Sequence, residues 1–389
     1  MLNRRILRIK AMQALYSYQV TEQSLKEVIN EELVAQYALD PAIHDFIEKP
    51  IFEEKQRLIS EVFLSNLQAG KAPANEHLEE EIIADIQASM DRYYTKVDAE
   101  RRSIKKQMVQ QADNIFDWYL KLLLLPGELA FIENQEKERL QKSTTKKDEQ
   151  VSFPLYGSAV ITAITTTSEI QSLSLEKKLS WSAHIEEVKS WYRELIKGDE
   201  VYQSLANQKS ISNEEELSFL LHFFKQLFFR SELTLSYMTE QILSWEDDAP
   251  ILRNMLVKTI KAYTKEEGIM LRPLSINKED DFDYFERLFS ETILKDDTVT
   301  HYIREKAKNW DISRISATDI ILLKMALTEM IVFPSIPVKV TINEYIEISK
   351  QYSTPKSKQF INGILDVLAN ELTSMGIVKK SGRGLIDNK

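Results

Sequence analysis

The stretch NWDISRISATDIILLKMALTEMIVFPSIPVKVTINEYIEISKQYSTPKSKQFINGILD, from Asn309 to Asp366, decides the fold. Apolar residues recur along it at helical spacing, and prolines interrupt the pattern near residues 334–337 and at Pro355. The stretch therefore predicts three helices, with a short basic turn between the last two.

That turn, residues 350–360, carries three lysines and no acid, in a chain whose net charge is −10. Thr354 followed by Pro355 is typical of a helix start, so we predict Thr354 as the N-cap. Free backbone N–H groups at a helix start accept phosphate. Because Lys356 and Lys358 add positive charge there, the turn predicts a site for a polyanion.

The N-terminus is basic as well. Arg4, Arg5, Arg8 and Lys10 stand together, and no acid precedes Glu22. Arginine offers a planar fork to phosphates and a flat surface to bases. We therefore predict that Arg4, Arg5 and Arg8 clamp a single strand, the alternative being a solvated helix face.

Aromatic residues accompany both basic segments. Phe360 follows the turn lysines and is predicted to lie beneath an unstacked base, unless it packs inward as most phenylalanines do. Tyr18 falls on the apolar stripe of the first helix, which favours the core, whereas Tyr16 falls opposite that stripe and is a candidate stacking platform.

A third candidate surface lies on the predicted helix Ser316–Val332. Its apolar residues define a buried face, which leaves Asp319, Lys324 and Glu329 for solvent or for a partner. The pattern alone does not separate a partner surface from an ordinary solvated face.

Composition narrows the classes of function. At 389 residues with 43% hydrophobic residues, the chain predicts a globular protein with one large core or several smaller ones. It has no cysteine, and its five histidines show no metal-ligand spacing, so we predict no metal, no cofactor and no catalytic centre. The apolar runs are too short for a bilayer and no signal peptide is evident, which predicts a cytoplasmic location.

Helical patterns dominate the whole chain and predict an all-α fold. The stretch 151–170 is rich in β-branched residues, but without a partner strand it is interpreted as an extended loop or a poor helix. About five helices are expected between Asp280 and Ile377. The predicted organisation is a first helix within 1–20, an inserted, largely helical region at 21–213, a helical core at 214–378 and a disordered tail at 379–389.

Three blocks of the chain resemble the NusB family of bacterial transcription antitermination factors. The start, RR followed by AMQALYSY at residues 11–18, is similar to that family's opening helix. The blocks NWDISRISATDIILLKMALTEMI and IPVKVTINEYIEISKQYS with SKQFINGILD resemble its later helices and the turn between the last two. Together the blocks cover about a quarter of the chain, with the best match within 280–378.

The resemblance implies a bundle of two small antiparallel helix sub-bundles, here with a large helical insertion. It implies binding of single-stranded boxA RNA from nascent ribosomal RNA transcripts, together with NusE, a small-subunit ribosomal protein, in the RNA polymerase antitermination complex. It also suggests Arg4, Arg5, Arg8, Ser357, Lys358 and Phe360 for RNA, and the helix Ser316–Val332, with Glu329 on its exposed side, for NusE. The residue pattern adds Tyr16 and Lys356 to the predicted RNA site, and Asp319 and Lys324 to the predicted partner face.

Two departures from the family pattern stand out. About 200 extra residues separate the first helix from the C-terminal block, and Lys356 replaces an acid of the enterobacterial form. NusB-like modules also precede ribosomal RNA cytosine methyltransferases, but such an enzyme needs a cysteine nucleophile and this chain has none. A helical protein-interaction factor without RNA binding remains the alternative.

Overall fold

The structure is a computed structural model that describes residues 2–40, 42, 44, 46–142, 152–306 and 315–386. Within these residues every regular element is a helix, and the sole strand-like feature is an isolated bridge between Thr264 and Gly268. The predicted all-α fold is confirmed.

The chain forms two compact units, and each is discontinuous in sequence. Unit 1 contains residues 1–6 and 110–281, and unit 2 contains residues 7–109 and 282–389. This division differs from the predicted one, because the region expected as a single insertion at 21–213 contributes to both units. The 63-residue helix α3, Glu80–Lys142, passes from unit 2 into unit 1 near residue 110.

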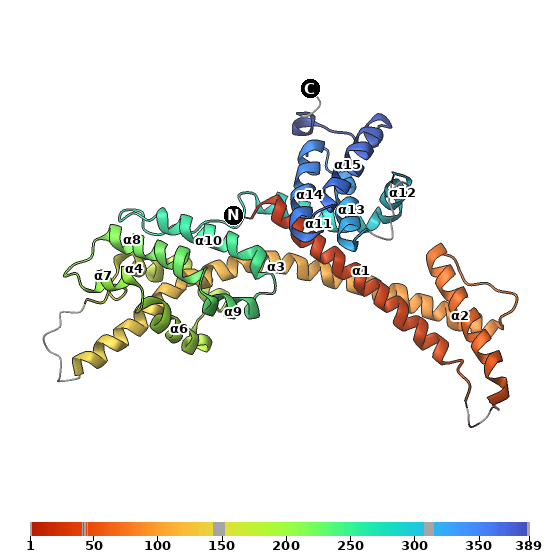
Figure 1. Ribbon diagram of the computed structural model, residues 1–389, viewed down its shortest axis with the longest axis horizontal. Coiled ribbons are helices and arrows are strands. Elements are labelled where there is room, and N and C mark those ends of the chain that lie inside the picture. The colour runs from red at the N-terminus through yellow and green to blue at the C-terminus, as the bar shows by residue number, and fades with distance from the viewer. Residues whose placement is uncertain are drawn as a thin grey trace. The chain divides into compact units, whose positions relative to one another are not determined.

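One part of unit 2 is a three-helix assembly made by the second half of α1 (Arg4–Ala35), by α2 (Lys49–Ala69) and by the first half of α3 (Figure 1, red to orange). A short 3-10 helix, Phe46–Glu48, precedes α2. Apolar residues from all three helices form its core: Ile29, Leu33, Ile59, Val62, Phe63, Ile82, Ile86, Met90 and Tyr93. We call residues 21–100 the acidic arm, because they carry eighteen acidic and seven basic residues.

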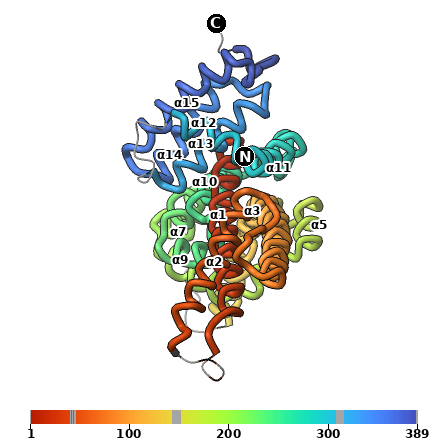
Figure 2. The backbone as a smooth tube through the Cα atoms, turned by 90° about the vertical axis from the view of Figure 1, so that its right-hand side faces the viewer, coloured from red at the N-terminus to blue at the C-terminus, as the bar shows by residue number. Residues whose placement is uncertain are grey.

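The other part of unit 2 is the C-terminal block of five helices, as the sequence predicts: α11 (Lys278–Leu294), α12 (Asp296–Lys306), α13 (Ala317–Val332), α14 (Val338–Tyr352) and α15 (Ser357–Ser374). Figure 2 shows these helices in colours from cyan (α11) to blue (α15), with α13, α14 and α15 packed on one another. Every α13 residue from Ile321 to Met330 is buried except Lys324. Because α13 is apolar nearly all round, it is the central helix of the block.

The C-terminal segment after α15 folds back onto the block. Gly382–Leu385 is a 3-10 helix, the Ser381 N–H donates to the Pro334 carbonyl at 3.0 Å, and the Lys380 amine donates to the Phe333 carbonyl at 3.0 Å. The prediction of a disordered tail is therefore wrong for residues 379–386, and residues 387–389 lie outside the described part.

Unit 1 is built on the second half of α3, against which short helices pack. These are α4 (Ala159–Thr166), α5 (Ser168–Glu176), α6 (Ile185–Trp191), α7 (Glu200–Ala206), α8 (Asn213–His222), α9 (Glu232–Gln241) and α10 (Trp245–Lys261), with a 3-10 turn at Ser182–His184 and π-helical turns at Tyr192–Ile196 and Phe223–Phe228. Its core contains an aromatic group in which Trp191 contacts Trp181, Phe228 and Tyr237 edge to face. The segment 151–170, expected as a loop or poor helix, contains α4 and the beginning of α5.

Candidate nucleic-acid interface

The basic turn lies between α14 and α15 in unit 2. α14 ends at Tyr352, the backbone of Ser353 is extended, and the Ser357 N–H donates to the Thr354 carbonyl at 3.0 Å. The helix α15 therefore starts at Ser357, with Lys356 as its N-cap residue and no side-chain cap. The predicted N-cap at Thr354 is wrong, because Pro355 and Lys356 form the turn before the helix.

Two lysines of this turn are available to a ligand. Lys356 and Lys358 are exposed, and within the described residues neither makes an ion pair, whereas Lys350 is paired with Glu347. Both lie at the start of an 18-residue helix, where the positive end of the helix dipole also attracts anions. The turn thus keeps the charge that the sequence predicts for a polyanion site.

Two neighbouring predicted contacts are buried instead. Ser357 is 4% exposed and Phe360 is 5% exposed. Phe360 is part of the inner face of α15. Its position therefore supports the alternative of inward packing and does not support a platform beneath a base. Ser357 donates its hydroxyl proton to Asp319 at 2.6 Å, which also directs it inward.

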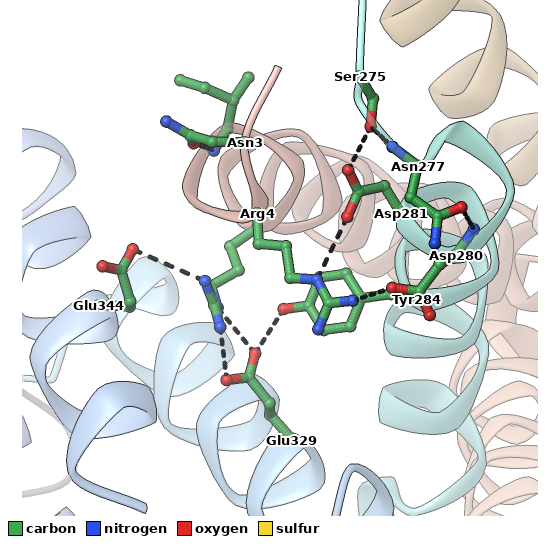
Figure 3. A network of polar contacts seen from close by, with 11 residues as sticks. Asn3, Arg4, Ser275, Asn277, Asp280, Asp281, Tyr284, Glu329 and Glu344 are labelled. Atoms are coloured by element: carbon green, nitrogen blue, oxygen red, sulfur yellow. Dashed lines mark hydrogen bonds and ion pairs between the residues drawn. The ribbon is translucent and has the colours of Figure 1, made fainter. Parts of the chain in front are cut away.

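The first helix presents fewer cations than its sequence suggests. Asn3 Oδ1 accepts the Ile6 N–H at 3.1 Å and so caps α1. Arg4 is partly exposed and is held by Asp280 at 2.5 Å and Asp281 at 3.3 Å, as Figure 3 shows. Arg5 is exposed, and Tyr16 is exposed to 47%.

Arg8 is buried, and the prediction that its guanidinium is presented to RNA is wrong. Arg8 is 3% exposed and makes a bidentate pair with Glu329, with both N–O distances at 2.7 Å. Its guanidinium also lies over the rings of Tyr284 and Tyr345, at 5.6 and 5.8 Å from their centroids. Glu344 lies 3.6 Å from its remaining nitrogen. Figure 3 shows the hydrogen bond between Tyr284 and Glu329, with Glu344 nearby.

Glu329 accepts hydrogen bonds from four residues on three other helices. Besides Arg8 from α1, Tyr284 from α11 donates at 2.5 Å, Thr341 from α14 at 2.8 Å and Tyr345 from α14 at 3.3 Å. Burial alone would raise the pKa of the Glu329 carboxyl, but the Arg8 charge and these donors outweigh burial and hold that pKa below its usual value. We call Arg8, Tyr284, Glu329, Thr341 and Tyr345 the buried ionic cluster.

The predicted partner face of α13 is largely closed. Glu329 is fully buried and Asp319 is 4% exposed, so the prediction that they remain for solvent or a partner is wrong. The Lys324 side chain is 14% exposed and pairs with Asp296 of α12 at 2.6 Å. These three side chains connect α13 to its neighbours within unit 2.

The sequence contained a signal for the buried ionic cluster. Arg8 shares a helical face with Ala11 and Leu15, because the three stand at positions i, i+3 and i+7. Glu329 stands in a helix that is apolar nearly all round, where a carboxylate requires a partner. The residues Tyr284, Thr341 and Tyr345 were not identified as its partners, because nothing local connects them.

Part of this region resembles a known protein family. Residues 250–370 match the model of the NusB family. The chain is thus similar to the NusB family over these residues, which we call the NusB domain. Its matched residues include α13, the basic turn and nearly all of α15, but not α1, which nevertheless supplies Arg8 to Glu329. The buried ionic cluster therefore makes α1 part of the same folded block as the NusB domain.

Curated relatives share the NusB domain. The transcription antitermination protein NusB of Salinibacter ruber is 45% identical over 104 residues, which is 27% of this chain and 65% of the relative. That of Chloroherpeton thalassium is 42% identical over 105 residues, covering 27% and 50%, and that of Natranaerobius thermophilus is 40% identical over 91 residues, covering 23% and 66%. The chain thus spans between half and just under two thirds of these relatives' length. No solved structure matches.

No group of histidine and carboxylate side chains among the described residues has an arrangement that would hold a metal ion. No helix in the described ranges is long and apolar enough to cross a bilayer.

Proposed function

We propose that this protein is a transcription antitermination factor that binds boxA-type single-stranded RNA of nascent ribosomal RNA transcripts together with NusE, and so supports ribosomal RNA synthesis. The observation that carries the proposal is the NusB family match over residues 250–370, which includes the basic turn. The relatives' name, transcription antitermination protein, supports the same role. The proposal includes no catalytic step.

The RNA surface that we propose is smaller than the one predicted from sequence. It consists of Lys356 and Lys358 at the turn and of Tyr16 on α1, all in unit 2, and Arg5, which belongs to unit 1, is proposed as a separate contact. Lysine cations and the start of α15 favour phosphate, and an exposed tyrosine ring favours stacking with a base. Arg4, also in unit 1, is cationic as well, although its guanidinium is shared with two aspartates.

The NusE contact is proposed without residues from α13. Glu329 and Asp319 are buried, and the Lys324 amine is engaged by Asp296. We propose that NusE binds elsewhere on the NusB domain, within the antitermination complex of RNA polymerase.

Binding of a fluorescein-labelled boxA RNA, followed by anisotropy with and without NusE over a salt series, tests the proposal. If about four phosphates are neutralised, a slope near −0.7 per phosphate gives a roughly fifty-fold loss of affinity between about 50 and 200 mM salt. The double variant Lys356→Ala/Lys358→Ala should bind about tenfold more weakly at low salt, and its salt slope should be shallower by about 1.4.

A matched control replaces two exposed lysines of unit 1, Lys209 and Lys265, by alanine. This variant has the same net charge as the double variant of the turn and should bind like the wild type. Absence of RNA binding, or a flat salt response, would favour the alternative of a protein-interaction factor without RNA binding. The inward position of Arg8 and Lys10, which removes two cations from the α1 surface, is the observation that favours that alternative.

A further inference from the structure

A group of hydroxyls connects the beginning of α13 to the basic turn. Asp319 Oδ2 accepts the Ser357 hydroxyl at 2.6 Å, and Ser357 Oγ lies 2.9 Å from both Ser353 Oγ and Thr354 Oγ1. Ser353 Oγ lies 3.3 Å from Ser316 Oγ, which in turn caps the Asp319 N–H at 3.1 Å. Two residues predicted for different surfaces, Asp319 and Ser357, are thus joined directly.

The carboxylate fixes the direction of every bond in this group. An ionised carboxylate only accepts, so the one hydroxyl proton of Ser357 goes to Asp319. Ser357 Oγ must then accept the hydroxyl proton of Ser353. Ser353 Oγ in turn accepts the hydroxyl proton of Ser316, and Ser316 Oγ accepts the Asp319 N–H. The bonds form a closed circuit, Asp319 to Ser316 to Ser353 to Ser357 and back to Asp319. Thr354 can only donate into it.

The circuit spans two helix starts, and its Asp319–Ser357 bond is shielded from water, while Ser316 and Ser353 are half-buried. Asp319 and Ser357 are each 4% exposed, and the second carboxylate oxygen, Asp319 Oδ1, is also buried and accepts no hydrogen bond from the described residues. A hydrogen bond to a charged acceptor is stronger than a neutral one, particularly where water is excluded. Ser357 stands between Lys356 and Lys358, so its anchoring fixes the backbone from which both cations project.

We propose that Asp319 is a positioning residue for RNA: through Ser357 it holds the basic turn in the conformation that presents Lys356 and Lys358 to phosphates. This inference rests on the proposed RNA binding and specifies how that site is kept in shape. Asp319 does not touch the RNA. Its negative charge repels a phosphate, so any gain in RNA affinity comes from ordering the turn. Because the turn is already ordered in the free protein, RNA binding does not have to supply the free energy of ordering it.

The test compares RNA affinity and stability among Ser357→Ala, Ser357→Thr, Asp319→Ala and the double variant Asp319→Ala/Ser357→Ala, all in the full-length chain with the boxA RNA probe. Ser357→Ala should weaken binding about fivefold, the equivalent of one net hydrogen bond. Its salt slope should match that of the wild type, because no cation is lost. Ser357→Thr, which keeps the hydroxyl, should restore affinity to within about twofold.

The double variant decides whether Asp319 acts through Ser357. Once Asp319 is replaced, removing the Ser357 hydroxyl should change affinity by less than about twofold, since coupled residues give non-additive effects. Wild-type affinity in Ser357→Ala, or effects of the two replacements that add in full, would overturn the inference. Urea unfolding shows whether Asp319→Ala is folded. If that variant is unfolded, the RNA affinity of Ser357→Ala alone decides the test. Lack of binding by the wild type would instead refute the proposed function.

Discussion

At the scale of single residues, the charges of α1 and α13 stabilise the fold more than they offer a surface. Arg8 and Glu329 are both buried, yet each is fully engaged, by the bidentate pair, by two aromatic rings and by three hydroxyls. Burying two ions is costly, and only such complete pairing offsets the cost. Breaking one side of the pair leaves the other charge stranded.

Arg8→Met is expected to destabilise unit 2 by about 3–5 kcal/mol, because it keeps the apolar stem but leaves the Glu329 carboxylate buried without its counter-charge. The free energy of unfolding from urea titrations, followed by circular dichroism, measures the effect. Arg4→Met is the matched control, since Arg4 makes partly exposed ion pairs that contribute less than about 1 kcal/mol. Equal effects of the two substitutions would contradict the structural role of Arg8.

A second buried carboxylate, Glu133 of α3, has the opposite pH behaviour. Glu133 is fully buried and accepts the N–H groups of Leu155 and Tyr156 and the hydroxyl of Tyr202. Burial raises its pKa from 4.5 to about 7, because the hydrogen bonds do not offset desolvation and no cation among the described residues pairs with it. A raised carboxyl pKa means that the folded state binds the proton more tightly than the unfolded state does.

Unit 1 should therefore lose stability as pH rises from about 4.5 to about 7, by roughly 3 kcal/mol at most. Glu133→Gln should remove that loss and be the more stable protein at pH 8. Tryptophan fluorescence in urea follows unit 1, which contains Trp118, Trp181, Trp191 and Trp245. Glu136→Gln, which removes a partly exposed carboxylate that accepts from Tyr192 and pairs with Lys197, is the control. A pH profile of Glu133→Gln that follows the wild type would contradict this assignment.

At the scale of helices, periodicity carried most of what the sequence predicted correctly. The five helices of the C-terminal block follow from apolar spacing and from the prolines between them, and the start of α1 follows from its stripe. The helix α15 starts at Ser357 instead of after Thr354, because the turn is closed by a backbone bond and by the hydroxyl circuit. Contacts between residues more than 30 positions apart set that boundary, and local rules do not contain them.

The candidate site was predicted less completely than the helices. Charge in the sequence located Lys356, Lys358 and Arg5 correctly as exposed cations, but it did not distinguish them from Arg8. The local sequence around an arginine does not show whether its side chain is solvated or buried against a carboxylate. In Arg8 that carboxylate lies 321 positions away in the chain. The folded tail was missed for a similar reason, because Lys380 and Ser381 bond to carbonyls of the α13–α14 connection.

At the scale of the whole molecule, charge is distributed very unevenly. The acidic arm, residues 21–100, has a net charge of −11, while the chain as a whole has −10. The arm belongs to the same compact unit as the basic turn. A concentrated negative field repels a polyanion at low ionic strength and is screened at high ionic strength. The arm should therefore weaken unspecific attraction of nucleic acid to the turn.

Replacing five exposed acids of the arm, Glu27, Glu31, Glu53, Glu54 and Glu61, by glutamine should raise affinity for any single-stranded RNA about threefold near 50 mM salt and leave it unchanged near 500 mM. The gain should be equal for boxA and scrambled RNA, so discrimination between them stays constant. The control makes the same five-charge change in unit 1, at Glu169, Glu176, Glu200, Glu232 and Glu240, and should have a smaller effect. An equal gain in RNA affinity for both variants would show that only the net charge matters. A gain in affinity that persists near 500 mM salt would show that the arm acts by direct contact and not by its electrostatic field.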